Sequence, residues 1–130
     1  MLEGKVLLIV DDDLTLLEMY VERIKAEGAI VVSAGDGEAG LAQIQESKPN
    51  VILLDIMMPK MNGFDVLKKM HENPEMAVIP VILLTALNDD QKRNEGLKLG
   101  AVDYIVKSET LPIDVIAKIN DVLEKAEKAK

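Results

Sequence analysis

The chain of 130 residues contains no cysteine and no tryptophan, and it has only one phenylalanine and two tyrosines. The absence of cysteine excludes disulfides, thiolate catalysis and zinc sites built on thiolates, and it allows a reducing compartment. Because aromatic residues are scarce, the core must be filled by Val, Ile, Leu, Met and Ala. The length is that of one ordinary domain, and we expect residues 1–130 to form a single one.

Positive charge is also in short supply, since the formal net charge is -8. An acidic surface repels phosphate backbones and anionic lipids, so we expect no direct binding to nucleic acid and none to a membrane. The first residues lack the apolar segment and cleavage site of a signal peptide, and no apolar run is long enough to span a bilayer. We therefore expect a cytoplasmic protein.

Five short apolar runs rich in β-branched residues recur along the chain without alternating with polar residues. They are residues 6–10, 30–32, 51–54, 79–84 and 104–106. This pattern is typical of strands that are buried on both faces of a sheet. We therefore predict five strands.

Five helices are predicted between and after these strands. The first carries apolar residues three or four positions apart, the second begins near Gly37, and the third follows Asn62. We expect the fourth to be capped by Asn88 and to end at Gly100, and the fifth to be capped by Thr110. Strands joined by helical crossovers run parallel, so the chain is predicted to be an α/β protein with a doubly wound parallel sheet.

Polar residues follow four of the five predicted strands, at the edge where open parallel sheets bind their ligands. They are Asp11, Asp12 and Asp13 after the first strand, Asp55 after the third, Thr85 after the fourth and Lys107 after the fifth. A single polar residue at such a place commonly marks only the point where the strand reaches water. Acids, a hydroxyl and an ammonium that converge on one patch instead indicate a site.

The chemistry of this patch points to phosphoryl transfer. Asp11, Asp12 and Asp55 repel one another unless a cation compensates, and Mg²⁺ suits a few carboxylates completed by water. Lys107 adds positive charge from the other side. A transferred phosphoryl group needs stabilisation of its oxygens and an in-line nucleophile, and an aspartate carboxylate can be that nucleophile.

Four stretches of the sequence carry a specific resemblance to a known family. They read VLLIVDDD (residues 6–13), DIMMPKMNG (55–63), LTA (84–86) and GAVDYIVK (100–107). Over residues 5 to about 124, the chain closely resembles the receiver domains of two-component response regulators. The resemblance implies a flavodoxin-like three-layer sandwich with strand order 2-1-3-4-5 and five helices.

The resemblance also implies roles for the residues of the patch. Asp55 would be the phosphoacceptor, and Mg²⁺ would be held by Asp11, Asp12, Asp55 and the backbone carbonyl of Met57. Lys107 would pair with the phosphoryl group. The donor would be a phosphohistidine on a sensor histidine kinase or on a histidine phosphotransfer protein. The chain would be no enzyme beyond catalysing its own phosphorylation and slow dephosphorylation.

A conformational switch is implied by the same resemblance. Thr85 would hydrogen-bond the phosphoryl group, and Tyr104 would swing inward when Thr85 moves. The change would reach a downstream protein partner through the face formed by the fourth predicted helix, the fifth strand and the fifth helix. The fourth helix is mostly polar, so we expect it to shift at small cost.

The sequence departs from the family pattern at one position and suggests a property at two others. Family members usually carry a proline, with a cis peptide bond, where this chain has Ser108. Since a cis bond without proline costs about 2.5–4 kcal/mol, we expect a trans bond or a strained cis bond after Lys107. Met57 and Leu87 are apolar and lie where a side chain helps to orient the hydrolytic water, so we predict a long-lived phosphoryl state.

Other interpretations of the same residues remain to be tested. Asp11 and Asp13 also fit the D-x-D-x-T motif of haloacid-dehalogenase-type phosphatases, although no convincing late acidic motif follows. The chain can also be a pseudo-receiver, a binding module that keeps the fold without being phosphorylated. Residues 35–40 match G-x-G-x-x-G, but two acids stand where a pyrophosphate would sit. His71, the only histidine, is interpreted as a solvated side chain near a helix end.

Overall fold

The computed structural model describes residues 2–86 and 88–128. A five-stranded sheet with the order β2-β1-β3-β4-β5 forms the middle of the molecule, and its neighbouring strands run parallel. The strands are β1 (Val6–Val10), β2 (Ile30–Ala34), β3 (Val51–Leu54), β4 (Val81–Thr85) and β5 (Asp103–Val106). The predicted α/β architecture and strand order are confirmed.

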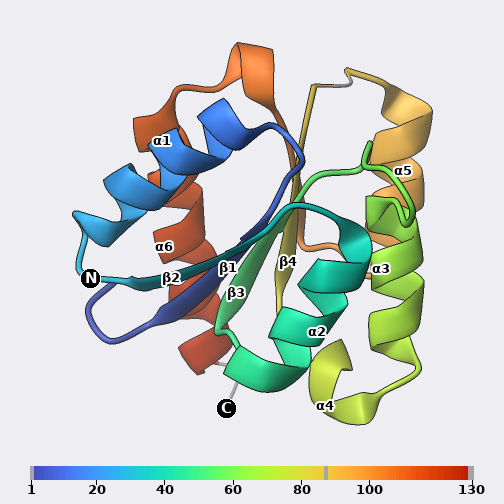
Figure 1. The fold of residues 1–130 in the computed structure, drawn as a ribbon, viewed down its shortest axis with the longest axis horizontal. Coiled ribbons are helices and arrows are strands. Elements are labelled where there is room, and N and C mark those ends of the chain that lie inside the picture. Colours follow the sequence, from blue (N-terminus) through green and yellow to red (C-terminus); the bar gives the residue numbers. More distant parts are fainter. Residues whose placement is uncertain (1, 87, 129–130) are drawn as a thin grey trace.

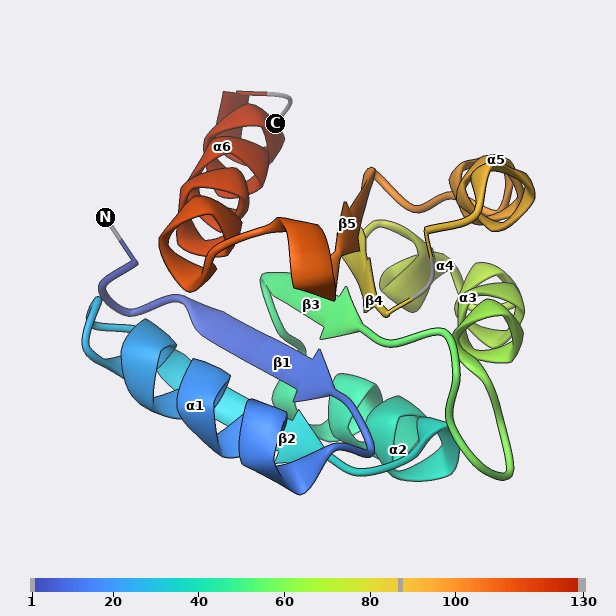
Figure 2. The same ribbon diagram turned by 90° about the horizontal axis from the view of Figure 1, so that it is seen from above.

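Helices cover both faces of the sheet. They are α1 (Leu14–Lys25), α2 (Gly37–Ser47), α3 (Gly63–His71), α4 (Pro74–Ala77), α5 (Asp90–Lys98) and α6 (Pro112–Lys128), with a 3₁₀ turn η1 (Lys107–Glu109). Helices α1 and α6 lie on one face, whereas α2, α3 and α5 lie on the other (Figures 1 and 2). This arrangement leaves the ends of the strands free of helices.

The alternation of side chains along each strand divides the core into two apolar layers. Leu8 and Val10 of β1 join the layer under α2 and α3, whereas Leu7 and Ile9 join the layer under α1 and α6. The central strands are therefore buried on both faces, as their uninterrupted apolar sequences predict. The packed sheet therefore fixes the positions of the residues that follow the carboxyl ends of its strands.

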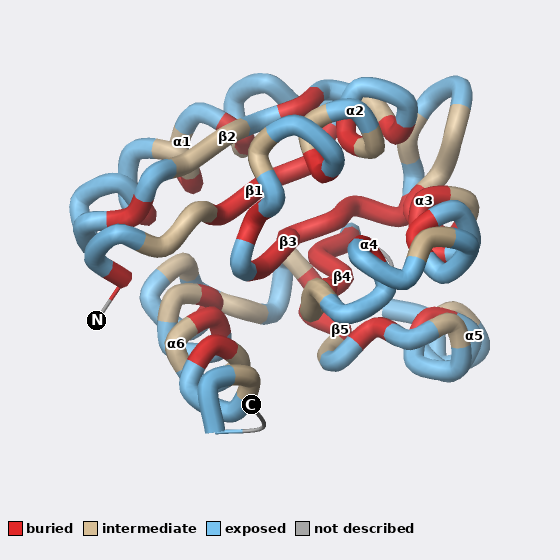
Figure 3. The backbone as a smooth tube through the Cα atoms, turned by 90° about the horizontal axis from the view of Figure 1, so that it is seen from below, coloured by how far each residue is buried: buried red, intermediate tan, exposed pale blue. Residues whose placement is uncertain are grey.

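The prediction of burial on both faces is wrong for β2. This strand is at the edge of the sheet, and its side chains are largely exposed or half-buried (Figure 3). Ile30 is 56% exposed. The apolar run of β2 resembles that of a central strand because the face covered by helices still requires apolar residues. The sequence of one strand does not show whether that strand lies at the centre or at the edge of the sheet.

A sixth helix, α4, was missed by the prediction of five. Asn73 caps it by accepting a hydrogen bond from the Glu75 N–H (2.9 Å), and Pro74 occupies its first turn. The next strand then begins at Val81 rather than at Ile79. The Ile79 N–H is used by the turn that ends α4, and Pro80 has no N–H to donate to the sheet.

Two helix starts differ from the predictions by one residue. Asp89, not Asn88, caps α5, because its carboxylate accepts hydrogen bonds from the N–H groups of Gln91 (2.9 Å) and Lys92 (3.2 Å). The Leu111 carbonyl, not Thr110, accepts the first backbone bonds of α6. In residues 2–86 and 88–128, no helix has the length and apolar character needed to cross a membrane.

Candidate functional site

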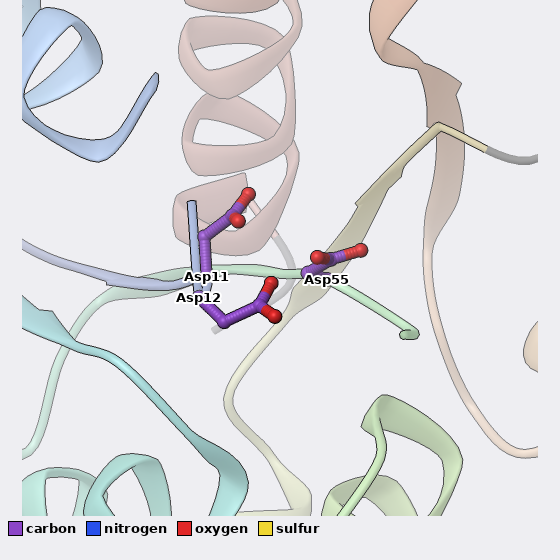
Figure 4. Close-up of side chains that lie close together, drawn as sticks. All are labelled: Asp11, Asp12 and Asp55. Carbon is purple, nitrogen blue, oxygen red and sulfur yellow. The ribbon is translucent and has the colours of Figure 1, made fainter. Parts of the chain in front are cut away.

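The carboxyl ends of β1 and β3 bring three acidic side chains together. Val10 of β1 pairs with Leu54 of β3, so the residues that follow them emerge side by side. The carboxylates of Asp11, Asp12 and Asp55 each offer an oxygen, and these oxygens lie within 4.8 Å of one another. Figure 4 shows Asp11 and Asp12 leaving the end of β1 next to Asp55. Three carboxylates this close form an oxygen-rich cluster of the kind that suits a cation.

Burial differs sharply among the three acids, and Lys107 balances their charge. Asp11 is 2% exposed and Asp55 is 5% exposed, whereas Asp12 is open to solvent. The Lys107 Nζ lies 2.6 Å from Asp11 Oδ2 and 3.5 Å from Asp55 Oδ2. Lys107 is therefore the internal counterion of the pocket, and it is shared unequally between the two buried carboxylates.

The protonation of Asp55 reflects this environment. Its pKa is raised from the ordinary value of 3.8 to about 6, mainly by burial and to a smaller extent by the nearby charge of Asp11, while Lys107 opposes the rise. A hydrogen bond from the Met57 N–H favours the ionised form. For Lys107, burial lowers the pKa, but the contacts with Asp11 and Asp55 outweigh it and leave the pKa raised. Asp55 is thus mostly ionised at neutral pH while Lys107 stays charged.

The loop after Asp55 is held tightly against the end of β3. The Gly63 N–H donates to the Ile56 carbonyl (2.9 Å), and Asn62 and Asp65 cap α3 reciprocally. A Cβ atom on Gly63 would lie only 2.4 Å from the backbone oxygen of Asp55. The backbone at Asp55 therefore depends on glycine at this position.

Thr85 and Tyr104 lie on the same face of the sheet. Tyr104 pairs with Leu83 and Val106 pairs with Thr85, so side-chain alternation places Tyr104 diagonally next to Thr85. Thr85 is fully buried and Tyr104 is 6% exposed. The end of β4 thus connects the neighbourhood of the pocket to the layer that faces α3 and α5.

Comparison with known proteins identifies the family. The family model for the response regulator receiver domain matches residues 7–125. The chain belongs to this family. Alkaline phosphatase synthesis transcriptional regulatory protein PhoP of Bacillus subtilis is 34% identical over 124 residues, covering 95% of this chain and 50% of PhoP. The probable transcriptional regulator ycf27 of Porphyridium aerugineum is 38% identical, covering 95% of this chain and 50% of ycf27.

Solved structures agree with this family. The receiver domain protein (CheY-like) of Methanospirillum hungatei JF-1 has a TM-score of 0.90 and 32% identity, covering 97% of this receiver and 98% of that chain. The BeF3-activated receiver domain of Klebsiella pneumoniae RstA has a TM-score of 0.83 and 28% identity, covering 91% of this receiver and 97% of that chain. The receiver spans about half the length of the two curated relatives.

The peptide bond before Ser108, where family members usually carry a proline, has an ordinary geometry. The bond between Lys107 and Ser108 is trans, which was one of the two expected outcomes. Lys107 still reaches both buried carboxylates, because β5 delivers it to the pocket and η1 begins with it. Leu87, used in the prediction of a long-lived phosphoryl state, lies outside the described residues.

Two other residues of the receiver have roles that sequence reasoning did not give. Asp13 belongs to the start of α1: its N–H donates to Asp11 Oδ1 (2.9 Å) and its own carboxylate accepts from the Leu16 N–H (3.1 Å). His71 is exposed, as expected, but its Nε2 lies 2.5 Å from the Leu99 carbonyl oxygen. It therefore bridges the end of α3 and the end of α5, a contact between segments that no local pattern indicates.

Proposed function

We propose that this receiver domain is the phosphoacceptor switch of a two-component phosphorelay, with residues 1–130 as its single domain. Asp55 receives the phosphoryl group, and the observation that carries the proposal is its environment. A buried carboxylate ionises near pH 6 between a fixed ammonium and a cluster of acidic oxygens. This combination matches what phosphoryl transfer to a carboxylate needs.

The donor set fits Mg²⁺. Asp11, Asp12 and Asp55 offer only oxygen, and Asp12 faces solvent, so water would be able to supply the remaining ligands of an ion held by these residues. Together with the backbone carbonyl of Met57, these residues would hold the ion. When bound, Mg²⁺ neutralises the carboxylates and the charge of the transferred group. Burial is the main reason for the raised pKa of Asp55, and the ion would offset the further rise that the Asp11 charge causes.

The transfer step needs little else from the protein. An Asp55 carboxylate oxygen attacks phosphorus in line, the new O–P bond forms, and the N–P bond to the donor imidazole breaks. The electron pair leaves with the imidazole, which takes up a proton. Lys107 then pairs with the phosphoryl oxygens, and the Thr85 hydroxyl hydrogen-bonds to them. The chain catalyses only this step and the slow hydrolysis of the phosphoaspartate, in which water takes the phosphoryl group and the Asp55 carboxylate is released, and it is otherwise no enzyme.

Apolar side chains around the pocket fit a protein donor. Four large ones are exposed on segments that follow the carboxyl ends of strands: Leu14 at the start of α1, Met57 in the loop after β3, and Leu111 and Ile113 at the start of α6. Exposed apolar side chains on the same edge of the sheet as a charged centre can exclude water and orient a partner. We infer that a sensor histidine kinase or a histidine phosphotransfer protein docks here, in the cytoplasm.

The output of the switch is a change in the surface formed by α5, β5 and α6. Within α5 only Gly96 is buried, so displacing the helix draws no buried side chain of its own out of the core. Phosphorylation adds charge and acceptor oxygens that attract Thr85, and Tyr104 follows on the same face of the sheet. The population then shifts toward a surface that a downstream protein recognises, without direct contact of the domain with nucleic acid or membrane.

The first test is intact-mass spectrometry after incubation with acetyl phosphate, with and without Mg²⁺. We expect one phosphoryl group on the native chain, dependent on Mg²⁺ and absent from Asp55→Asn. An adduct that persists in Asp55→Asn would refute Asp55 as acceptor. Multiple turnover of a phosphoester would favour the phosphatase interpretation. Absence of both phosphorylation and Mg²⁺ binding would favour the pseudo-receiver.

A further inference from the structure

Helix α5 is attached to the rest of the fold without a buried side chain. Its only buried residue is Gly96, and the one large apolar side chain within it, Leu97, is 43% exposed, whereas the half-buried Leu99 packs on the core just after the helix ends. A Cβ atom at Gly96 would lie 2.3 Å from Leu83 Cδ1 and 3.5 Å from the ring of Phe64. The backbone of α5 therefore rests directly on β4 and α3, and the side chains within the helix contribute little apolar burial to hold it there.

Two neighbouring cations of α5 instead lie over aromatic rings. The Lys92 Nζ is 5.8 Å from the centroid of the Phe64 ring, and the Arg93 Cζ is 5.4 Å from that of Tyr104. Both distances are within the range of a cation–π contact. Phe64 belongs to α3 and Tyr104 to β5, and consecutive helical residues point about 100° apart. Helix α5 thus spans both elements, and Figure 2 shows it beside α3 at the margin of the molecule.

These two contacts use most of the aromatic rings that the chain has. The sequence contains one phenylalanine, two tyrosines and no tryptophan. Tyr104 is 6% exposed while Arg93 lies at the surface, so the guanidinium covers the ring from the solvent side. Burial, followed by the charge of Asp89, raises the pKa of Tyr104, and Arg93 opposes the rise, which agrees with this close approach. The buried position of Tyr104 and the position of α5 therefore depend on each other.

We propose that Arg93 is a positioning residue that holds Tyr104 in its buried position and so couples the placement of α5 to the phosphorylation pocket. The inference rests on the proposed switch function and adds the residue by which α5 acts on Tyr104. If α5 moves outward, Arg93 leaves the ring and Tyr104 loses its cover. If Tyr104 swings out, Arg93 loses the ring. Each movement therefore favours the other, which is the property of a two-state element.

The test compares three single variants in the intact chain. Arg93→Met removes the cation but keeps a long apolar stem, Arg93→Lys keeps a cation, and Lys92→Met is the matched control. The control removes the same charge from the same helix, at the ring of Phe64 instead of Tyr104. Two quantities are measured: the NMR signals of the Tyr104 ring, assigned with Tyr104→Leu, and the affinity for beryllium trifluoride with Mg²⁺ as a phosphoryl mimic.

We expect Arg93→Met to move the Tyr104 ring signals and to weaken binding of the mimic about two- to fivefold relative to Lys92→Met. Arg93→Lys restores most of the affinity, and Arg93→Met has no further effect in a Tyr104→Leu background. Unmoved ring signals, or the same loss of affinity in that background, would overturn the proposal. If the native chain does not bind the mimic at all, the phosphoacceptor function fails and the coupling with it, while the ring signals still decide whether Arg93 positions Tyr104.

Discussion

Replacing the proposed phosphoacceptor is expected to stabilise the metal-free protein. Raising the pKa of Asp55 from 3.8 to about 6 corresponds to about 3 kcal/mol, because one pKa unit is worth about 1.4 kcal/mol. This is the cost of keeping an ionised carboxylate buried beside Asp11. Asp55→Asn removes the charge and keeps the shape, and Lys107 retains its closer partner, Asp11, at 2.6 Å. No buried charge is left unpaired by the change.

The sign of the pH dependence follows from the direction of the shift. The pKa of Asp55 is higher in the folded than in the unfolded chain, so the folded state binds more protons. Stability from this group is present below about pH 4 and is lost as the pH rises through about 6. The advantage of Asp55→Asn over the native chain is therefore expected to be about 3 kcal/mol at pH 8, about half of that at pH 5, and small at pH 4.

Urea unfolding at these three pH values, in a metal-free buffer, measures the difference directly. In a thermal scan, about 3 kcal/mol corresponds to about 10 °C for a chain of this size. Asp12→Asn is the matched control, since it removes an acid from the same cluster at an exposed position. Mg²⁺ is expected to reduce the difference in unfolding free energy between the two proteins, because it stabilises the native chain more than Asp55→Asn. The electrostatic account of the pocket would be refuted if Asp55→Asn were no more stable than the native chain at pH 8, or if the difference in their unfolding free energies did not change with pH.

Two further predictions concern the loop beside Asp55. Gly63→Ala places a Cβ atom against the Asp55 backbone oxygen; we expect a loss of about 1–3 kcal/mol in urea unfolding, together with slower phosphorylation. Gly35→Ala, with no atom within 4 Å of the added Cβ, serves as control, and equal effects would contradict the packing argument. Because Met57 and Leu87 are apolar, we expect the phosphoryl group to outlast minutes in a mass-spectrometric time course and Met57→Gln to shorten its lifetime. A half-life of seconds in the native chain would exclude this.

The elements that the sequence predicted well are those whose signals are local. The β-branched runs at 6–10 and 51–54 became the central strands, and Asp11 and Asp55 meet because parallel strands end at one edge. The short helix α4 also has local signals, Asn73 and Pro74, but four residues carry too little apolar periodicity to register. The exposure of Ile30 depends on the position of β2 in the sheet, which only the other strands decide.

Contacts between distant segments explain the remaining misses. The choice between Asn88 and Asp89 as cap of α5 is a difference of one residue between two good capping side chains. The stacking of Arg93 on Tyr104 and the contact of His71 with the Leu99 carbonyl join residues that are 11 and 28 positions apart. Neither pairing has a signature in composition or spacing, because both result from where α5 settles on the sheet.

The position of Lys107 also bears on how the pocket selects ions. Its ammonium is a tethered monovalent cation that already sits between the buried carboxylates. Sodium or potassium would bring no more charge than this resident group and would have to surrender hydration to enter. A divalent ion gains twice the attraction, and it can leave the ammonium in place for the incoming phosphoryl oxygens. If the proposed Mg²⁺ site is correct, its occupancy is expected to follow the free concentration of divalent metal rather than the total ionic strength.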